Sequence, residues 1–254
     1  MINKIYKSVL ITGASSGIGL ETLKRFLKEN VKVYALDKDV SILEKLKKKH
    51  KFEIIQIDLF DTDQIYKKLT KLKVDVVVCN AGIGRGAEGI LKASRQDIEL
   101  STRLNVESYL HTLKTIVPGM IKRRKGHVVL MGSLAGLYPQ MSTVYGGQKG
   151  AIHRIAQSLR IELSGSRVKV SEICPGRTKT NFGKAAFTDK NKAKKFMSGF
   201  TLLEPRDIAD AIIFALSVFV STSTSWIKFS VPHCFLGSLE PIANAMFRCF
   251  SSGR

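Results

Sequence analysis

Short apolar runs alternate along the chain with longer segments whose apolar residues recur at the period of a helix. Several of the short runs are apolar throughout, which is typical of strands buried on both faces of a parallel sheet. These repeated β-α units predict the α/β class, with a doubly wound parallel sheet flanked by helices. The predicted strands are 8–11, 31–36, 52–57, 74–79, 127–131 and 168–173, and the predicted helices are 17–29, 40–49, 63–72, 95–122 and 145–163, with one more beginning at Pro205.

The alternation is interrupted twice. Residues 178–203 are lysine-rich and weakly helical, and an excursion of this kind after a strand commonly covers the ligand crevice of an α/β sheet. Beyond residue 217 charged residues nearly vanish and the periodicity is lost. We therefore divide the chain into one domain, residues 1–217, and a divergent C-terminal tail, residues 218–254.

The net charge of +20 is unusual for a chain whose apolar and charged fractions are otherwise ordinary. Such a charge suits nucleic acid, an anionic membrane or an acidic partner. The lysine clusters at 45–51, 122–125 and 190–195 are not interleaved with aromatic residues as in single-strand binders. We therefore assign the charge mostly to solvated surface and expect no nucleic acid as a partner. The longest apolar run, 211–220, is too short to cross a membrane as a helix, so no membrane is expected either.

The four cysteines form no CxxC pair and no zinc-like spacing with histidine, so no metal is expected. Cys79 and Cys174 lie in apolar runs and are interpreted as small core residues. The N-terminus leads directly into a strand without the apolar core of a secretion signal. These features favour the cytoplasm.

The first predicted strand runs into the sequence TGASSGIG, in which Gly13, Gly17 and Gly19 precede a helix. Glycines at such a turn let the backbone approach a pyrophosphate, which then lies at the N-terminus of the helix. The spacing differs from the G-x-G-x-x-G fingerprint, but its place between the first strand and the first helix favours a dinucleotide site.

Two acids follow later strands. Asp37 ends the second strand, where its carboxylate can accept hydrogen bonds from the adenosine ribose and would repel a 2′-phosphate, so NAD is favoured over NADP. Lys38 could instead pair with a 2′-phosphate, and Asp37 could simply be a helix N-terminal acid. Asp58 follows the third strand, where it could meet the adenine edge or cap the next turn.

Tyr145 and Lys149 are four residues apart in STVYGGQKG, which places them on one face of a helix. A free phenol has a pKa of about 10, and a nearby cation lowers it. We therefore expect Lys149 to lower the pKa of Tyr145, so that this phenol can exchange a proton at neutral pH. The glycines of this helix are costly, since each interior glycine destabilises a helix by roughly 1 kcal/mol relative to alanine.

Taken together, these motifs resemble those of the short-chain dehydrogenase/reductase family. The resemblance covers roughly residues 7–217, in the family's order and at about its intervals. It implies a Rossmann-type sheet and hydride transfer between a nicotinamide and an alcohol or carbonyl. The matching features are TGASSGIG, CNAG at 79–82, Asn105, Ser133, the Tyr145–Lys149 pair and PGRTKT at 175–180.

The resemblance also implies roles for individual residues. Ser133 would hydrogen-bond the substrate oxygen, and Asn105 would fix a water that links Lys149 to solvent. Gln148, where the family often has serine, and Ser108, where it usually has glycine, are unexplained departures. The residues expected to touch the cofactor are Gly13, Ser15, Ser16, Gly17, Ile18, Gly19, Asp37, Asp58, Leu59, Asn80, Ala81, Gly82, Tyr145, Lys149, Pro175, Gly176 and Thr180.

Residues 113–136 and 204–212 resemble the subgroup acting on 3-hydroxy acids, including serine-like substrates, although that subgroup usually prefers NADP. Pairing through the helices at 102–122 and 145–163 would give a homodimer or tetramer. A 3-oxoacyl-[acyl-carrier-protein] reductase is a second hypothesis, favoured by the basic surface, and a non-catalytic nucleotide- or nucleic-acid-binding protein is a third.

The tail itself has two open explanations. The subgroup commonly has VNIN at the start of its last strand, and STSTSWIKF at 221–229, re-read one base upstream, can encode V-N-I-N-I-M-D-Q-I. A frameshift near 216–220 is therefore one hypothesis, and a divergent, partly disordered C-terminus is the other. A tail without a final strand would leave a bare sheet edge.

Overall fold

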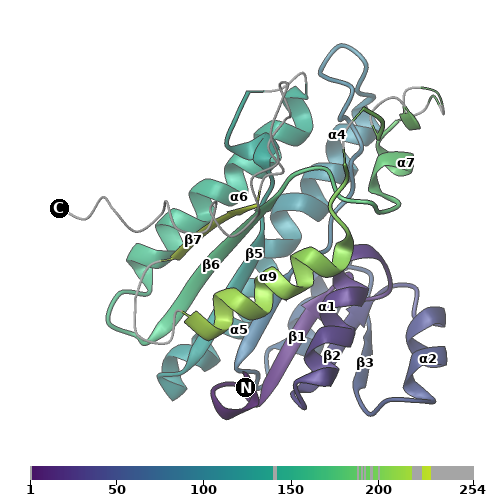
Figure 1. Ribbon diagram of the computed structural model, residues 1–254. Helices are drawn as coiled ribbons and strands as arrows, with labels where there is room; N and C mark the ends of the chain where they lie inside the picture. The colour runs from purple at the N-terminus through teal and green to yellow at the C-terminus, as the bar shows by residue number, and fades with distance from the viewer. Residues whose placement is uncertain are drawn as a thin grey trace, which may run out of the picture.

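The computed structural model describes residues 2–139, 142–187, 201–218 and 225–229, together with positions 189, 191, 193–194 and 197–199. Within this part of the chain, seven strands form one parallel sheet in the order β3-β2-β1-β4-β5-β6-β7, which confirms the predicted α/β fold (Figure 1). The strands are β1 (Ser8–Thr12), β2 (Lys32–Asp37), β3 (Glu53–Gln56), β4 (Val76–Cys79), β5 (Gly126–Met131), β6 (Val168–Pro175) and β7 (Ser225–Phe229). The strand order reverses between the parallel neighbours β1 and β4, because the chain adds β2 and β3 on one side of β1 and β4 to β7 on the other. Ligands of such sheets bind at the carboxyl ends of the strands at this reversal.

Helices cover both faces of the sheet. Two of them, α1 and α9, lie side by side on one face, in front of the strands in Figure 1. On the opposite face, α3, α5 and α6 pack against a second apolar core. The helices are α1 (Gly17–Lys28), α2 (Ser41–Lys47), α3 (Thr62–Leu69), α4 (Arg95–Thr102), α5 (Ser108–Arg123), α6 (Thr143–Glu162), α7 (Phe182–Ala186) and α9 (Pro205–Val218), with short 3-10 turns η1 (Ile2–Lys4) and η3 (Leu134–Gly136). Each β-α unit therefore buries its apolar stripe against the sheet.

The helix predicted over 95–122 is interrupted. A π-helical segment, η2 (Arg103–Glu107), separates α4 from α5, and it is closed by a hydrogen bond from the backbone N–H of Ser108 to the carbonyl of Arg103. Such π segments appear mostly as single turns within α-helices, frequently at functional sites. Asn105 lies within this turn and is fully buried.

A strand lies within the segment that the sequence assigned to the tail. The backbone of β7 runs parallel to β6, in register from Ser171 opposite Ser225 to Pro175 opposite Phe229. A final strand is thus present, contrary to the bare edge that a tail without one would leave. Five residues without helical periodicity gave too short a signal to identify it. The rest of the tail, residues 219–224 and 230–254, lies outside the described residues, and with it the hypotheses of a frameshift and of disorder.

Among the described residues, no helix is both long enough and apolar enough to span a membrane.

Candidate active site

A cavity of about 1210 Å³ opens at the carboxyl ends of the strands. It brings together nearly all the residues predicted for the site. Ser15 and Gly19 do not line the cavity, but each contacts a residue that does: Ser15 contacts Asp37, and Gly19 packs against Gly13. The predicted residues in its wall are Gly13, Ser16, Gly17, Ile18, Asp37, Asp58, Leu59, Asn80, Ala81, Gly82, Asn105, Ser133, Tyr145, Lys149, Pro175, Gly176 and Thr180.

The glycine-rich turn after β1 has the shape of a phosphate cradle. Gly13 has a φ of +67°, and a Cβ there would lie 2.9 Å from the Cα of Ala81. A Cβ on Gly19 would lie 2.0 Å from the carbonyl oxygen of Gly13, so Gly19 lets α1 begin directly against the turn. The Ser16 side chain makes no capping hydrogen bond, and the first turn of α1 holds no acid. The uncapped amides at this helix N-terminus therefore fit the pyrophosphate of a dinucleotide.

Asp37 is held at the end of β2 by backbone amides. The N–H of Ser15 donates to one carboxylate oxygen at 2.9 Å, and the N–H of Lys38 donates to the other at 2.8 Å. Ser15 therefore orients Asp37 rather than lining the cavity. Asp58 lines the cavity and also accepts the N–H of Phe60 at 3.1 Å, so both interpretations of this acid fit the structure.

Asn80 ties β4 to β1 where the sheet reverses. Its side-chain amide donates to the carbonyls of Thr12 at 3.0 Å and Gly13 at 3.2 Å. The Thr12 hydroxyl in turn accepts the backbone N–H groups of Asn80 and Ala81. These bonds fix the two walls of the cavity relative to each other.

Tyr145, Ser133 and Lys149 converge at the ends of β5 and α6. The Tyr145 ring packs against Phe182 of α7, with 5.1 Å between ring centroids. The ammonium of Lys149 donates to the carbonyl of Met131 at 2.7 Å and lies 5.9 Å from the centroid of the Tyr145 ring. Lys149 is thus held between the strand end and the tyrosine, and its side chain is almost completely buried.

The pKa of Tyr145 departs from the predicted direction. Burial raises this pKa to about 12, and the hydrogen bond with Ser133 acts in the opposite direction. Burial therefore outweighs the lowering that was expected from Lys149, whose ammonium donates to the Met131 carbonyl. Burial also lowers the pKa of Lys149, to about 8, while Cys174 and Glu172 act to raise it.

Asn105 is fixed by reciprocal contacts with Ile83, which follows β4. Its side-chain oxygen accepts the backbone N–H of Ile83 at 2.9 Å, and its amide donates to the Ile83 carbonyl at 2.8 Å. The amide donates a second bond, also of 2.8 Å, to the side-chain oxygen of Gln148. The departure at Gln148 is thereby explained, because this side chain accepts the second amide hydrogen of a buried asparagine.

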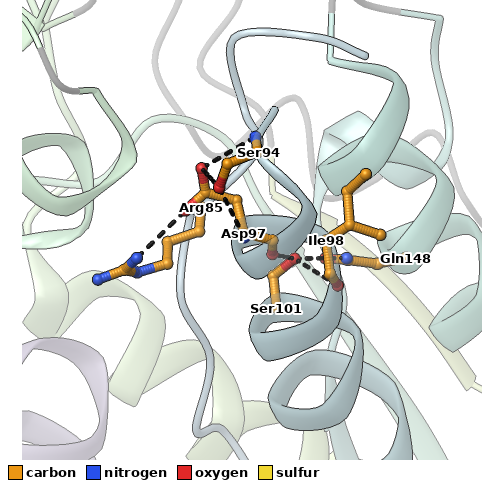
Figure 2. A network of polar contacts seen from close by, with 6 residues as sticks. All are labelled: Arg85, Ser94, Asp97, Ile98, Ser101 and Gln148. Atoms are coloured by element: carbon orange, nitrogen blue, oxygen red, sulfur yellow. Dashed lines mark hydrogen bonds and ion pairs between the residues drawn. The ribbon is translucent and has the colours of Figure 1, made fainter. Parts of the chain in front are cut away.

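Gln148 also connects the catalytic helix to α4 (Figure 2). Its amide nitrogen donates to the Ser101 hydroxyl at 2.7 Å, and Ser101 donates to the carbonyl of Asp97 at 2.6 Å. Asp97 forms a capping box with Ser94 and an ion pair with Arg85 at 3.2 Å. From Asn105 through Gln148 and Ser101 to the Asp97 carbonyl, each side chain donates a hydrogen bond to the next group. The orientation of the Gln148 amide is therefore fixed by its surroundings.

The glycines around Tyr145 have different surroundings. A Cβ on Gly136 of η3 would lie 2.5 Å from the backbone of Lys149, so this glycine allows η3 to approach α6. A Cβ on Gly146 would lie 3.2 Å from the carbonyl of Ala135, which is also a tight approach. Nothing lies within 4 Å of a Cβ placed on Gly147. Close packing therefore accounts for Gly146, whereas no contact in the structure explains Gly147.

The structure adds residues that the sequence did not single out. Phe182 covers Tyr145, and the positively charged Lys92 and Arg177 line the cavity. Phe182 lies in the excursion that was expected to cover the crevice, but no motif distinguished it there. Among the described residues, no group of three or more His, Cys, Asp or Glu side chains is placed to hold a metal ion.

Comparison with known proteins gives concordant matches. The family model described as short chain dehydrogenase matches residues 7–191. An uncharacterized short-chain type dehydrogenase/reductase of Sinorhizobium fredii is 32% identical over 214 residues, covering 84% of this chain and 86% of the relative. The NADP-dependent 3-hydroxy acid dehydrogenase of Escherichia coli strain K12 is also 32% identical over 214 residues, covering 80% of this chain and 86% of the relative.

A solved structure agrees with these relatives. The closed form of serine dehydrogenase complexed with NADP+ has a TM-score of 0.82 and 29% identity, covering 92% of this chain and 98% of that one. The chain therefore belongs to the short-chain dehydrogenase/reductase family and is an NAD(P)-dependent oxidoreductase that transfers hydride between a nicotinamide cofactor and a small alcohol or carbonyl compound.

Proposed function

We propose that the protein interconverts a small 3-hydroxy acid and the matching 3-oxo acid, with NAD preferred to NADP. The observation that carries this proposal is the convergence of Ser133, Tyr145 and Lys149 in one cavity that also contains the cations Lys92 and Arg177. A carboxylate substrate would be attracted to those cations. The names of the 3-hydroxy acid dehydrogenase and the serine dehydrogenase given above support the same substrate class.

In this proposal each side chain has a distinct task. The cavity would hold the nicotinamide cofactor, which would supply the hydride-transfer chemistry when bound. Tyr145 exchanges a proton with the substrate oxygen, and Ser133 donates a hydrogen bond to that oxygen as charge develops on it. Lys149 supplies positive charge and holds the nicotinamide ribose, while Asn105 fixes a water that connects Lys149 to solvent. Phe182, which packs on Tyr145, excludes bulk water from the reacting groups.

The cofactor preference rests on Asp37. Its carboxylate lines the cavity at the end of β2, with both oxygens oriented by backbone amides. A carboxylate there can accept ribose hydroxyls and repels a 2′-phosphate. The 3-hydroxy acid dehydrogenase is named as NADP-dependent and the serine dehydrogenase structure contains NADP+, so the NAD preference proposed here rests on Asp37 alone.

Fluorescence titration with NADH and with NADPH tests this preference. We expect NADH to bind more tightly, and Asp37→Ser to improve NADPH binding relative to NADH by about tenfold, because a like-charge contact of about 1.4 kcal/mol is removed. The matched control is Glu53→Gln, which removes an exposed carboxylate from the neighbouring strand β3. Equal affinities in the unmodified protein would reject the NAD preference.

A substrate comparison tests the reaction itself. Reduction of free 3-oxo acids with NADH should be faster than reduction of 3-oxoacyl groups attached to a carrier protein. Tyr145→Phe should abolish the reaction and retain NADH binding, because it removes only the proton donor. Faster turnover of the carrier-linked substrates would favour the 3-oxoacyl reductase hypothesis.

The assembly and compartment are also part of the proposal. A homodimer or tetramer formed through α5 and α6 is expected by family analogy, and light scattering of the purified protein measures it. Both cysteines in the described part of the chain, Cys79 and Cys174, are free thiols, which supports a reducing cytoplasm. Cell fractionation tests that location.

A further inference from the structure

A buried carboxylate lies behind the catalytic helix. Glu172 belongs to β6, between Leu130 of β5 and Trp226 of β7 in the sheet register, and only 2% of its surface is exposed. A carboxylate removed from water this completely is costly unless it is paired and hydrogen-bonded. The contacts of this carboxylate therefore indicate its role.

One carboxylate oxygen is held by His153 of α6. The distance between Nδ1 of His153 and Oε2 of Glu172 is 2.7 Å, and Nε2 of the same ring lies 3.3 Å from the amide nitrogen of Gln157. A carboxylate oxygen can only accept, so Nδ1 carries the proton that is donated to Glu172. His153 is therefore a hydrogen-bond donor that fixes the carboxylate.

The other oxygen, Oε1, is buried, and the Cys174 side chain makes a further hydrogen bond with the carboxylate group. Oε1 lies against Gly132, where an added Cβ would be 2.3 Å from it. Gly132 directly follows Met131, the residue whose carbonyl accepts the ammonium of Lys149. Lys149 and His153 are also one helical turn apart on α6. Glu172 therefore lies against the chain neighbour of the Met131 carbonyl and against the residue one helical turn from Lys149, and its charge acts on Lys149 from there.

The other charged and titratable groups near Glu172 supply no second negative charge. Burial, followed by the nearby Glu172, raises the pKa of the Cys174 thiol well above its usual range, so that thiol stays neutral. On α6, burial lowers the pKa values of Lys149 and Arg160, and Cys174 and Glu172 both act to raise them. The Tyr145 phenol is neutral at pH 7, because burial raises its pKa to about 12.

We propose that Glu172, fixed by His153, is a positioning residue that supplies the buried negative charge keeping Lys149 protonated. This inference rests on the proposed function, in which Lys149 acts as a cation. Gly132 is glycine because a side chain there would displace the carboxylate. No atom of Glu172 needs to touch the substrate or the cofactor for this effect.

The test measures the protonation of Lys149 in two ways. The first is the pH dependence of kcat/KM for carbonyl reduction, in which deprotonation of Lys149 limits activity at alkaline pH. Glu172→Gln should move this alkaline limit to lower pH by about 1 unit, since a nearby opposite charge is removed. The second is titration of 13C-labelled lysine by NMR in the protein without cofactor, with the Lys149 signal assigned from Lys149→Met. Its midpoint should move in the same direction.

The matched control is Glu162→Gln, which removes an exposed carboxylate from the end of α6 and should leave both midpoints unchanged. If Glu172→Gln does not fold, the pair Glu172→Met with His153→Leu replaces both polar partners by apolar side chains of similar size, a change that is often tolerated. The pair should give the same displacement.

An unchanged Lys149 signal in a folded Glu172 variant would overturn the inference. Failure of the proposed function has a different signature, because the unmodified protein would then turn over no 3-oxo acid. The NMR titration needs no substrate, so it decides the role of Glu172 in either case.

Discussion

Lys149 combines a catalytic position with an unfavourable environment. Burial lowers its pKa from the usual 10.5 to about 8, which corresponds to about 3 kcal/mol. Below pH 8 the lysine is charged in both the folded and the unfolded chain, so the full cost of burying the charge is present. Between pH 8 and 10.5 the unfolded chain binds more protons than the folded one, so the folded state becomes more stable as the pH rises.

Lys149→Met should therefore abolish activity and raise the free energy of unfolding at pH 7 by up to about 3 kcal/mol. The gain should shrink as the pH rises from 8 to 10.5. Urea unfolding at pH 7 and at pH 9.5 measures both effects. Lys114→Met, which changes an exposed lysine of α5, is the control and should show no such pH dependence. A variant less stable than the original protein at pH 7 would contradict this account.

Gln148 is the residue whose role depends most on distant partners. Gln148→Met keeps the length of the side chain but removes its bonds to Asn105, Ser101 and Thr102. We expect kcat to fall about tenfold because Asn105 loses a fixed orientation. NADH affinity should remain, because the glycine-rich turn is untouched. The control is Gln96→Met on the exposed side of α4, and an unchanged kcat would limit Gln148 to a packing role.

The sequence identified site residues whose signal is local. Tyr145 and Lys149 share one helix face, and Gly13 follows one strand, so spacing alone brings each to its element. Glu172 and His153 carry no such signal, because they meet only when β6 packs against α6. The pKa of Tyr145 could not be predicted either, because its direction is set by burial, which depends on the packing of the whole site.

At the scale of elements, α6 is weakened by glycines that do not all serve packing. Gly147→Ala should stabilise the protein by about 1 kcal/mol, because a methyl group there meets nothing within 4 Å. Gly136→Ala in η3 is the contrasting variant and should destabilise it, since its methyl group would meet the Lys149 backbone. Thermal unfolding of both variants measures the difference, and a destabilised Gly147→Ala would point to a partner outside the described residues.

The predicted elements succeeded where the apolar pattern was long. The six strands expected from β-branched runs are present as β1 to β6, with ends displaced by at most two residues. The π segment η2 was not predicted, because one inserted residue leaves the helical apolar pattern almost unchanged. The strand β7 was not predicted because its five residues follow a region without periodicity.

At the scale of the whole molecule, β7 completes the edge of the sheet. Its backbone pairs with β6 from Ser171 to Pro175, beside the buried Glu172. A chain ending at residue 218 should therefore melt at lower temperature and aggregate, because the β6 edge loses its partner. A chain ending at residue 229 keeps β7, so comparing the two isolates the effect of this strand. Equal melting temperatures would show that β7 contributes nothing to stability.

Sequencing the coding DNA tests the frameshift hypothesis for the tail. An uninterrupted frame in independent reads of the DNA would reject the frameshift hypothesis for residues 216–220. If the frame is shifted, restoring it should still give a strand at residues 221–229. The codons of alternating Ser and Thr, re-read one base upstream, encode alternating apolar and polar residues.

The reversal of strand order between β1 and β4 separates the residue that selects the cofactor from the residues that transfer the proton. Asp37, which discriminates between the two cofactors in our proposal, lies on the β2 side of that reversal, whereas Ser133, Tyr145 and Lys149 lie beyond β4. Substitutions at the end of β2 can therefore exchange one cellular pool of reducing equivalents for another without altering the proton-transfer groups. A lineage built on this sheet can change its metabolic supply and its substrate by independent mutational steps.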